Sequence, residues 1–170
     1  NAKPLWHYVI ADRYLARNPY VPAPQPIQFI LSPNSPVVFP ASSPEKRYHN
    51  FDQSGRFTSA CSGMIYGDEW PLGDSRQSHA FICEPFHNLV QHQVLSEQGI
   101  SFAAQRSEGE EQQDFFASED RWCRPVMIRT GPDGGLWIAD MYRYMIEHPE
   151  WLPNEGKAEL LPHYRLGEDR

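Results

Sequence analysis

The sequence predicts an all-β fold, and more specifically part of a β-propeller with about two to three four-stranded antiparallel blades. Residues 122–142 read as a β-hairpin, because apolar side chains alternate along both arms of a glycine-rich turn. A motif in residues 82–92 returns in residues 138–148, as expected of repeated blades. Eight of the sixteen prolines fall between Pro19 and Pro44, which excludes a helix there.

The hairpin turns at the segment Gly131-Pro132-Asp133-Gly134-Gly135. Proline presets φ for the first central turn position, and the glycines accept positive φ. This turn predicts four cross-strand pairs: Thr130 with Leu136, Ile128 with Ile138, Val126 with Asp140, and Arg124 with Tyr142. Arg124 and Asp140 are therefore expected together at the open end. Both faces are largely apolar, so we expect neighbours to cover the hairpin on both sides.

The repeat aligns Ile82–His92 with Ile138–His148 at an offset of 56 residues. Upstream, Met64–Gly67 aligns with Ile128–Gly131 at an offset of 64, so the earlier hairpin has eight more residues in its loop. A repeat of this length, made of four short strands, is close to a propeller blade. Because a propeller needs at least about four blades to close, we expect the chain to be a piece of a longer polypeptide.

In chain order, residues 1–18 carry aromatic and β-branched residues that favour a strand, although their spacing also suits one or two helical turns. Residues 19–44 read as a proline-rich connection, with strands limited to 27–31 and 37–39. Four short strands are expected at 57–66, 79–84, 88–95 and 101–105, followed by a solvated acidic loop at 107–114. The predicted units are residues 1–44 (the remainder of a preceding blade with the connection), 45–106 (a blade) and 107–170 (a blade with a C-terminal extension).

Composition and motifs exclude several function classes. The net charge of -7 argues against a nucleic-acid partner or an anionic membrane surface, both of which attract basic patches. No apolar run is long enough to span a bilayer, so no transmembrane segment is expected here. The three cysteines form no Cys-x-x-Cys-His motif, so no haem is attached to this segment. The sequence also has no glycine-rich dinucleotide motif and no nucleophile elbow.

Several motifs after residue 50 resemble the later propeller blades of one bacterial family. They are Phe57-Thr58-Ser59-Ala60-Cys61, Phe81-Ile82-Cys83-Glu84-Pro85, Arg124-Pro125-Val126, Gly131-Pro132-Asp133-Gly134-Gly135-Leu136-Trp137, Asp140-Met141-Tyr142-Arg143 and Ile146-Glu147-His148-Pro149. The segment Leu5–Pro19 resembles this family too. The family is the predicted membrane-bound dehydrogenases of planctomycete-type bacteria, whose propeller is similar to the quinoprotein glucose and sorbosone dehydrogenases and is often followed by a haem-binding domain.

The resemblance implies a periplasmic or extracellular sugar or alcohol dehydrogenase that uses pyrroloquinoline quinone and calcium. Its substrate would be a carbohydrate or another small molecule, and a haem-binding domain would lie elsewhere in a longer chain. The competing function is a non-catalytic propeller that binds a glycan or a protein. In that case Trp122, Phe86 and Tyr142 would serve as flat anchors at the same rim.

The candidate site residues are expected at the mouth of the central channel. Arg124, with Asp140, Arg143 and Trp122, is expected to bind the cofactor, because the planar fork of arginine suits a carboxylate. Glu84 is the repeat partner of Asp140, and both could bind calcium through hard oxygens. His87 is the candidate general base.

Each of these residues also has a structural interpretation. Arg124 and Asp140 could form an architectural ion pair, and each acid could cap its own loop. His87 could be an ordinary hydrogen-bonded loop residue. His92 and His148 are interpreted as structural, because they lie away from the channel-mouth loop. If Arg124 serves the site rather than the fold, Arg124→Lys should weaken ligand binding and leave the melting temperature nearly unchanged.

The cysteines carry one further expectation. The repeat places Cys61 about one diagonal position from Cys83 on the same face of a strand pair. An oxidising periplasm would then favour a Cys61–Cys83 disulfide, with Cys123 free. The alternative is a pair of buried, apolar thiols.

Overall fold

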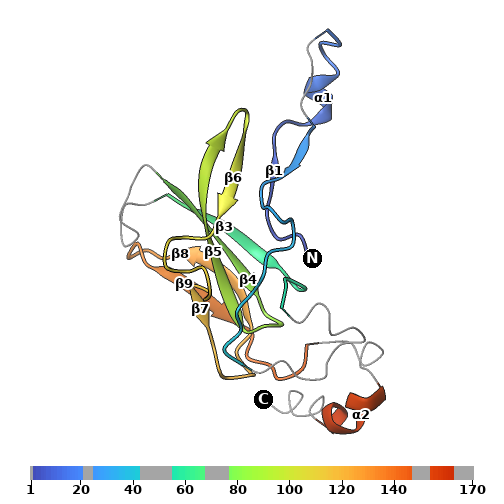
Figure 1. Cartoon of the computed structure of the whole chain (residues 1–170), viewed down its shortest axis with the longest axis vertical. Helices are drawn as coiled ribbons and strands as arrows, with labels where there is room; N and C mark the ends of the chain where they lie inside the picture. Colours follow the sequence, from blue (N-terminus) through green and yellow to red (C-terminus); the bar gives the residue numbers. More distant parts are fainter. Residues whose placement is uncertain (1, 21–24, 43–54, 68–76, 147–153, 163–170) are drawn as a thin grey trace.

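The computed structural model describes residues 2–20, 25–42, 55–67, 77–146 and 154–162, and these form mainly antiparallel β-sheet. Within these ranges no helix is long and apolar enough to cross a membrane. The elements are β1 (Trp6–Tyr8), α1 (Asp12–Leu15), β2 (Ile27–Phe29), β3 (Cys61–Tyr66), β4 (Ser78–Glu84), β5 (Leu89–Gln98), β6 (Ser101–Gln105), β7 (Phe116–Ala117), β8 (Pro125–Thr130), β9 (Leu136–Asp140) and α2 (Asn154–Leu160). The predicted antiparallel, mostly β architecture is therefore confirmed (Figure 1).

The main sheet has the order β3-β4-β5-β6, and β7 pairs with the start of β5. Its four long strands lie where the sequence predicts them. The first begins only at Cys61, because Phe57 is buried in the core rather than paired in the sheet. β5 pairs with β6 through residues 94–98 and with β7 through residues 89–90. The segment between β6 and β7 therefore runs past the middle of β5.

Each face of the main sheet is covered by a different part of the chain. Ile82, Leu89 and Leu95 pack against the N-terminal residues Leu5 and Leu31. On the other face, Tyr66, Phe81, Cys83 and Val90 pack against Ile128 of β8. Figure 1 shows the β8–β9 hairpin lying against the main sheet. Two sheets thus stack face to face, as the apolar patterning requires.

The β8–β9 hairpin follows the predicted register next to its turn. Thr130 pairs with Leu136 and Ile128 with Ile138, as predicted. The register shifts between Pro125 and Met127, so Pro125 rather than Val126 lies opposite Asp140. A β-bulge of this kind adds one residue to one strand, and periodicity alone does not reveal it. The open-end pairs that the sequence predicts are therefore wrong by one residue.

The outer face of this hairpin differs from the expectation that both faces are covered. Met127 is 46% and Trp137 59% exposed in the structure, whereas Ile128 is fully buried. One face of the hairpin therefore packs on β3 and β4, and the other carries exposed apolar side chains.

The two hairpins of the predicted repeat share a feature but differ in detail. Each has a register irregularity at the start of its first strand, between Cys61 and Met64 in β3 and between Pro125 and Met127 in β8. Met64 pairs with Phe81, one residue from the Ile82 position that the repeat gives. Among the described residues the second unit, residues 107–170, has three strands rather than four, and the first of them, β7, pairs with β5 of the earlier unit. The predicted superposition of His92 on His148 lies outside the described residues.

The N-terminal residues combine both structures that their pattern allows. β1 pairs with β2, which lies within the strand expected at residues 27–31, and α1 forms a single helical turn. His7 shares a hydrogen bond of 3.0 Å with the Ser101 hydroxyl of β6, and Leu31 forms a parallel bridge with Ala104. This segment is therefore attached to the main sheet through β6.

All three cysteines are free thiols, so the expected disulfide is not formed in this structure. Its predicted position is also corrected, because Cys61 lies directly opposite Cys83 in the β3–β4 register rather than on a diagonal.

The hairpin turn gives a first testable prediction. A Cβ added at Gly131 would clash with Nε1 of Trp137, whose indole N–H donates to Asp133 Oδ1 at 3.0 Å. Gly131→Ala should break this contact and lower the free energy of unfolding by about 1–2 kcal/mol, as overpacking does. Urea denaturation measures the change. Gly67→Ala is the matched control, because its Cβ would meet no atom within 4 Å; an equal loss in both variants would contradict the explanation.

Candidate functional site

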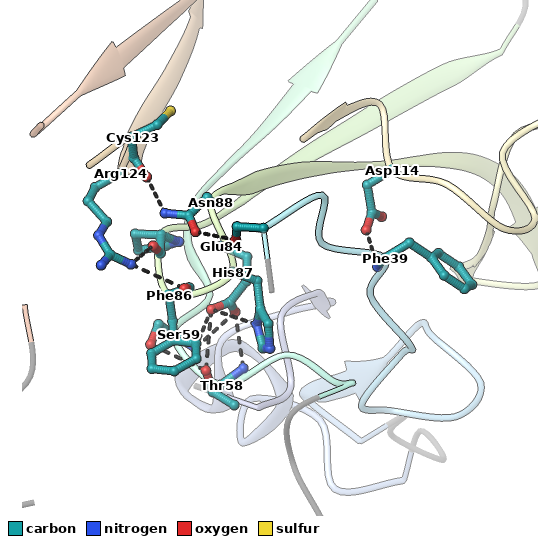
Figure 2. Close-up of polar contacts among 12 residues, drawn as sticks. Phe39, Thr58, Ser59, Glu84, Phe86, His87, Asn88, Asp114, Cys123 and Arg124 are labelled. Carbon is teal, nitrogen blue, oxygen red and sulfur yellow. Dashed lines mark hydrogen bonds and ion pairs between the residues drawn. The ribbon is translucent and has the colours of Figure 1, made fainter. Parts of the chain in front are cut away.

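The predicted site residues gather at one end of the stacked sheets. Three segments meet there: the turn between β4 and β5, residues 118–124 before β8, and residues 141–146 after β9. Figure 2 shows Arg124 and Asn88 reaching between the first two of these segments.

Arg124 is the central residue of this end, and it is fully buried. Its Nη1 donates to the carbonyls of Pro85 at 2.8 Å and Phe86 at 3.1 Å. Its Nε donates to the carbonyl of Arg143 at 2.7 Å, and Nη2 donates to that of Tyr144. The planar fork of the guanidinium therefore joins two loops through main-chain carbonyls.

This geometry corrects the expectation for Arg124. A buried guanidinium engaged by four carbonyls supports a structural role, so Arg124→Lys is no longer expected to leave the melting temperature unchanged. The structural interpretation from sequence was a side-chain ion pair between Arg124 and Asp140, but Asp140 binds the main chain of Arg124 rather than its guanidinium. Asp140 Oδ1 instead accepts the main-chain N–H groups of Arg124 at 2.6 Å and Tyr142 at 2.8 Å. Tyr142 has a φ of 49°, so Asp140 supports a left-handed residue two positions after the end of β9.

Glu84 also binds main chain. Its carboxylate is fully buried and accepts the N–H groups of Thr58 and Ser59 at 2.9–3.1 Å, together with the Thr58 hydroxyl at 3.3 Å. These bonds fix the segment that leads into β3 against the end of β4. The alternative in which each acid caps a loop is therefore favoured for both Glu84 and Asp140.

His87 lies beside Glu84, with Nδ1 3.6 Å from Oε1 of the carboxylate. The imidazole is 2% exposed and lies edge-on to the ring of Phe86. A histidine oriented by a carboxylate is the arrangement of many general bases. Here, however, a substrate would need access to a buried ring.

The calcium hypothesis requires several oxygen ligands around one point. Within the described residues, no group of three or more His, Cys, Asp and Glu side chains is arranged to hold a metal ion. The carboxylates of Glu84 and Asp140 are already occupied by N–H donors. These two acids therefore do not fit a calcium site, and the occupied fork of Arg124 does not fit an acidic quinone.

Three aromatic rings form the accessible part of this end. The ring of Trp122 lies 5.8 Å from that of Tyr142 and 5.9 Å from that of Tyr144, measured between centroids. Tyr142 is 50% exposed, and Trp122 and Tyr144 are half-buried. Asp140 and Arg143 are exposed beside them. We call Trp122, Tyr142 and Tyr144 the aromatic rim. Phe86, the other expected anchor, is buried beneath this end and is not part of the rim.

Two further residues shape the site, and the sequence did not indicate a role for either of them. Asn88 ends the β4–β5 turn with a φ of 59°, donates to the Cys123 carbonyl and accepts the Ser42 hydroxyl. An asparagine in a short turn is the sequence feature that indicates this backbone conformation, because asparagine tolerates left-handed φ values.

The second residue is Cys123. Burial, together with the nearby Asp140 carboxylate, raises the pKa of the Cys123 thiol to about 11. Cys123 is therefore a neutral thiol near pH 7.

A second polar cluster lies on β4 and β5, and it corrects the interpretation of residues 107–114 as only a solvated loop. His79 Nδ1 and His92 Nε2 are 2.9 Å apart, and His92 Nδ1 is 3.2 Å from Glu110 Oε1. Asp114 is buried, pairs with Arg106 at 2.9 Å, and accepts the side-chain amide of Gln91 and the main-chain N–H of Phe39. Glu110 and Asp114 thus contact β5 in the stretch between the residues that pair with β6 and those that pair with β7.

Comparisons with known proteins identify the family. No curated protein and no solved structure matches this chain. A family model described as a domain of unknown function, DUF7133, matches residues 1–170. Because this match spans the whole chain, the chain belongs to the DUF7133 family.

Proposed function

We propose that this chain forms neighbouring units of a β-propeller and binds a carbohydrate at its aromatic rim. The propeller part of the proposal is supported by the face-to-face packing of β8 on β3 and β4. It is also supported by the similar irregularity at the start of each hairpin.

The aromatic rim carries the binding part of the proposal. Sugars present C–H faces that pack on aromatic rings and hydroxyls that bond to nearby polar groups, and a rigid aromatic side chain loses little entropy on binding. The rim offers a half-exposed Tyr142 ring beside Trp122 and Tyr144, with the exposed Asp140 and Arg143 at its border. Beneath it, the buried Arg124 guanidinium donates to the carbonyls of Arg143 and Tyr144 and so holds the loop that presents Tyr142 and Tyr144.

Saccharide binding tests the proposal directly. A panel of neutral and acidic mono- and disaccharides is screened by saturation-transfer NMR, and each hit is titrated by calorimetry. Trp122→Ala should lower the affinity for the bound saccharide at least about tenfold, the typical effect of removing an aromatic anchor. Trp122→Phe should retain most of the affinity, because it keeps a flat ring.

Trp137→Ala is the matched control, because Trp137 is an exposed tryptophan on the outer face of the β8–β9 hairpin rather than at the rim. It should leave saccharide affinity unchanged. Binding that falls equally in both variants, or no saccharide bound by the wild type, would refute the rim as a carbohydrate site.

A quinoprotein-like sugar or alcohol dehydrogenase is the second candidate. The contact between His87 and Glu84 favours it, since a carboxylate next to an imidazole can orient a general base. In that candidate, residues other than Arg124, Glu84 and Asp140 would hold pyrroloquinoline quinone and calcium. Dye reduction with added quinone, calcium and sugars or alcohols tests it: activity that His87→Gln abolishes supports a dehydrogenase, and no activity with any substrate counts against it.

A further inference from the structure

Cys61 and Cys83 face each other across the β3–β4 strand pair. They are direct register partners, and both are free thiols. Opposed residues in an antiparallel pair have Cα atoms about 4.5–5.5 Å apart. Disulfides join Cα atoms about 4.4–6.8 Å apart, so this backbone already lies within the range that a disulfide requires.

The surroundings make the two thiols unequal. Cys83 is fully buried, whereas Cys61 is half-buried and lines a cavity of about 240 Å³ with Lys3, Trp6 and Ser62. The Cys61 thiol donates to the Val126 carbonyl of β8 at 3.5 Å. A small reagent therefore reaches Cys61 first, and Cys83 lies on the inner side of the pair.

The strand is irregular where Cys61 lies. The register shifts between Cys61 and Met64, and Ser62 has a φ of 47°. Ser62 Oγ accepts the main-chain N–H of Ile128 at 3.3 Å and a guanidinium N–H of Arg129 at 3.0 Å. Cys61 thus borders a bulge that is held against β8, and the regular β3–β4 ladder is interrupted next to the thiol pair.

We propose that Cys61 and Cys83 are a thiol–disulfide exchange site, which closes into a reversible cross-strand disulfide when the chain meets a low-molecular-weight disulfide. The Cys61 thiolate attacks one sulfur of that disulfide, forms a mixed disulfide and releases the first small thiolate. The Cys83 thiolate then attacks the Cys61 sulfur, forms the Cys61–Cys83 bond and releases the second. Both protein thiols lose a proton, and the small disulfide is reduced to two thiols.

Closure also affects the contact between the two sheets. The Cys61 sulfur that donates to Val126 in the thiol form has no proton to donate in the disulfide form. Oxidation therefore removes one hydrogen bond between β3 and β8 while it links β3 to β4. The site couples the redox state of the main sheet to its contact with the β8–β9 hairpin.

The thiol pKa values determine the speed of this exchange. Burial, with a smaller contribution from the Glu84 carboxylate, raises the pKa of Cys61. Burial and then Cys61 raise the pKa of Cys83 to about 12, against a smaller lowering by Arg129. Only thiolates attack, so exchange near pH 7 is slow and its rate rises by up to about tenfold per pH unit below the thiol pKa.

The experiment incubates the chain in glutathione buffers from fully reducing to fully oxidising, at pH 8, and blocks remaining thiols with N-ethylmaleimide. Trypsin separates the three cysteines into peptides 57–76, 77–106 and 122–129, because Arg124 precedes a proline. Mass spectrometry should find peptide 57–76 linked to peptide 77–106 in oxidising buffer and released again in reducing buffer. Cys123 should be alkylated throughout.

Three variants make the test specific. Cys123→Ser should leave the link unchanged. Cys83→Ser should stop at a glutathione adduct on Cys61, and Cys61→Ser should acquire an adduct on Cys83 at least about tenfold more slowly. In concentrated urea, Cys123 should also form disulfides. The proposal is overturned if Cys61 and Cys83 stay alkylated in the most oxidising buffer, if folded wild type links Cys123 equally well, or if only a glutathione adduct accumulates.

Discussion

Arg124→Ala is expected to lower the free energy of unfolding by about 3–5 kcal/mol, because it leaves buried carbonyls without their charged donor. The carbonyls concerned belong to Pro85 and Phe86 on one side and to Arg143 and Tyr144 on the other. For a chain of 170 residues this corresponds to a fall in melting temperature of about 6–20 °C. Urea denaturation followed by tryptophan fluorescence measures it.

Arg124→Lys should lose about half as much, because lysine keeps the charge but has neither the planar fork nor enough donors for both loops. Arg143→Lys is the control, since this arginine is exposed in one of the two loops that Arg124 joins and its substitution should change stability by less than about 0.5 kcal/mol. If Arg124→Lys unfolds like the wild type but loses affinity for an anionic ligand, the ligand-binding role predicted from sequence is right and the structural role is wrong.

Glu84→Gln is expected to lower the free energy of unfolding by about 2–3 kcal/mol. The substitution keeps the shape of the side chain but replaces one carboxylate oxygen with an NH₂ donor, which would face the N–H groups of Thr58 and Ser59. It also removes charge-assisted bonds in a buried site, where an unpaired donor costs the most. Glu97→Gln is the control, because Glu97 is exposed at the far end of β5.

A double-mutant cycle separates the structural role of Glu84 from a catalytic one. Thr58→Val removes the hydroxyl that donates to Glu84 Oε1. The combined effect with Glu84→Gln should therefore be non-additive by about 0.5–1 kcal/mol. Unchanged stability in Glu84→Gln, together with a loss of dye-linked activity, would instead make Glu84 a functional carboxylate.

Sequence patterning predicted the strands and the hairpin register where local rules control the structure. The turn at Gly131–Gly135 fixes the pairs Thr130 with Leu136 and Ile128 with Ile138, because a tight turn leaves little freedom of register. The bulge at Val126 was not predictable, since it lies next to Arg124, whose side chain binds carbonyls outside the hairpin. Tertiary contacts therefore decide the register at the open end.

The site shows the same division between local and tertiary effects. The sequence identified Arg124, Asp140, Glu84 and His87 as residues that belong together, and the structure brings them to one end of the sheets. The sequence did not indicate that their polar atoms bind main-chain groups. Almost every residue type has a main-chain carbonyl and N–H group, so such a partner cannot be recognised from the residue types. The acidic pattern of residues 107–114 predicts a solvated loop for a related reason: only the path of the chain along β5 places Glu110 and Asp114 beside buried polar groups.

The Arg124 guanidinium lies among oxygen atoms much as a metal ion does. Carbonyl oxygens from two separate loops converge on one positive charge, an arrangement that many proteins complete with a bound divalent cation. Here the cation is covalently part of the chain and stays charged at every physiological pH. The cohesion of these two loops is therefore set when the chain folds, and neither a chelator nor a change in free calcium acts on it.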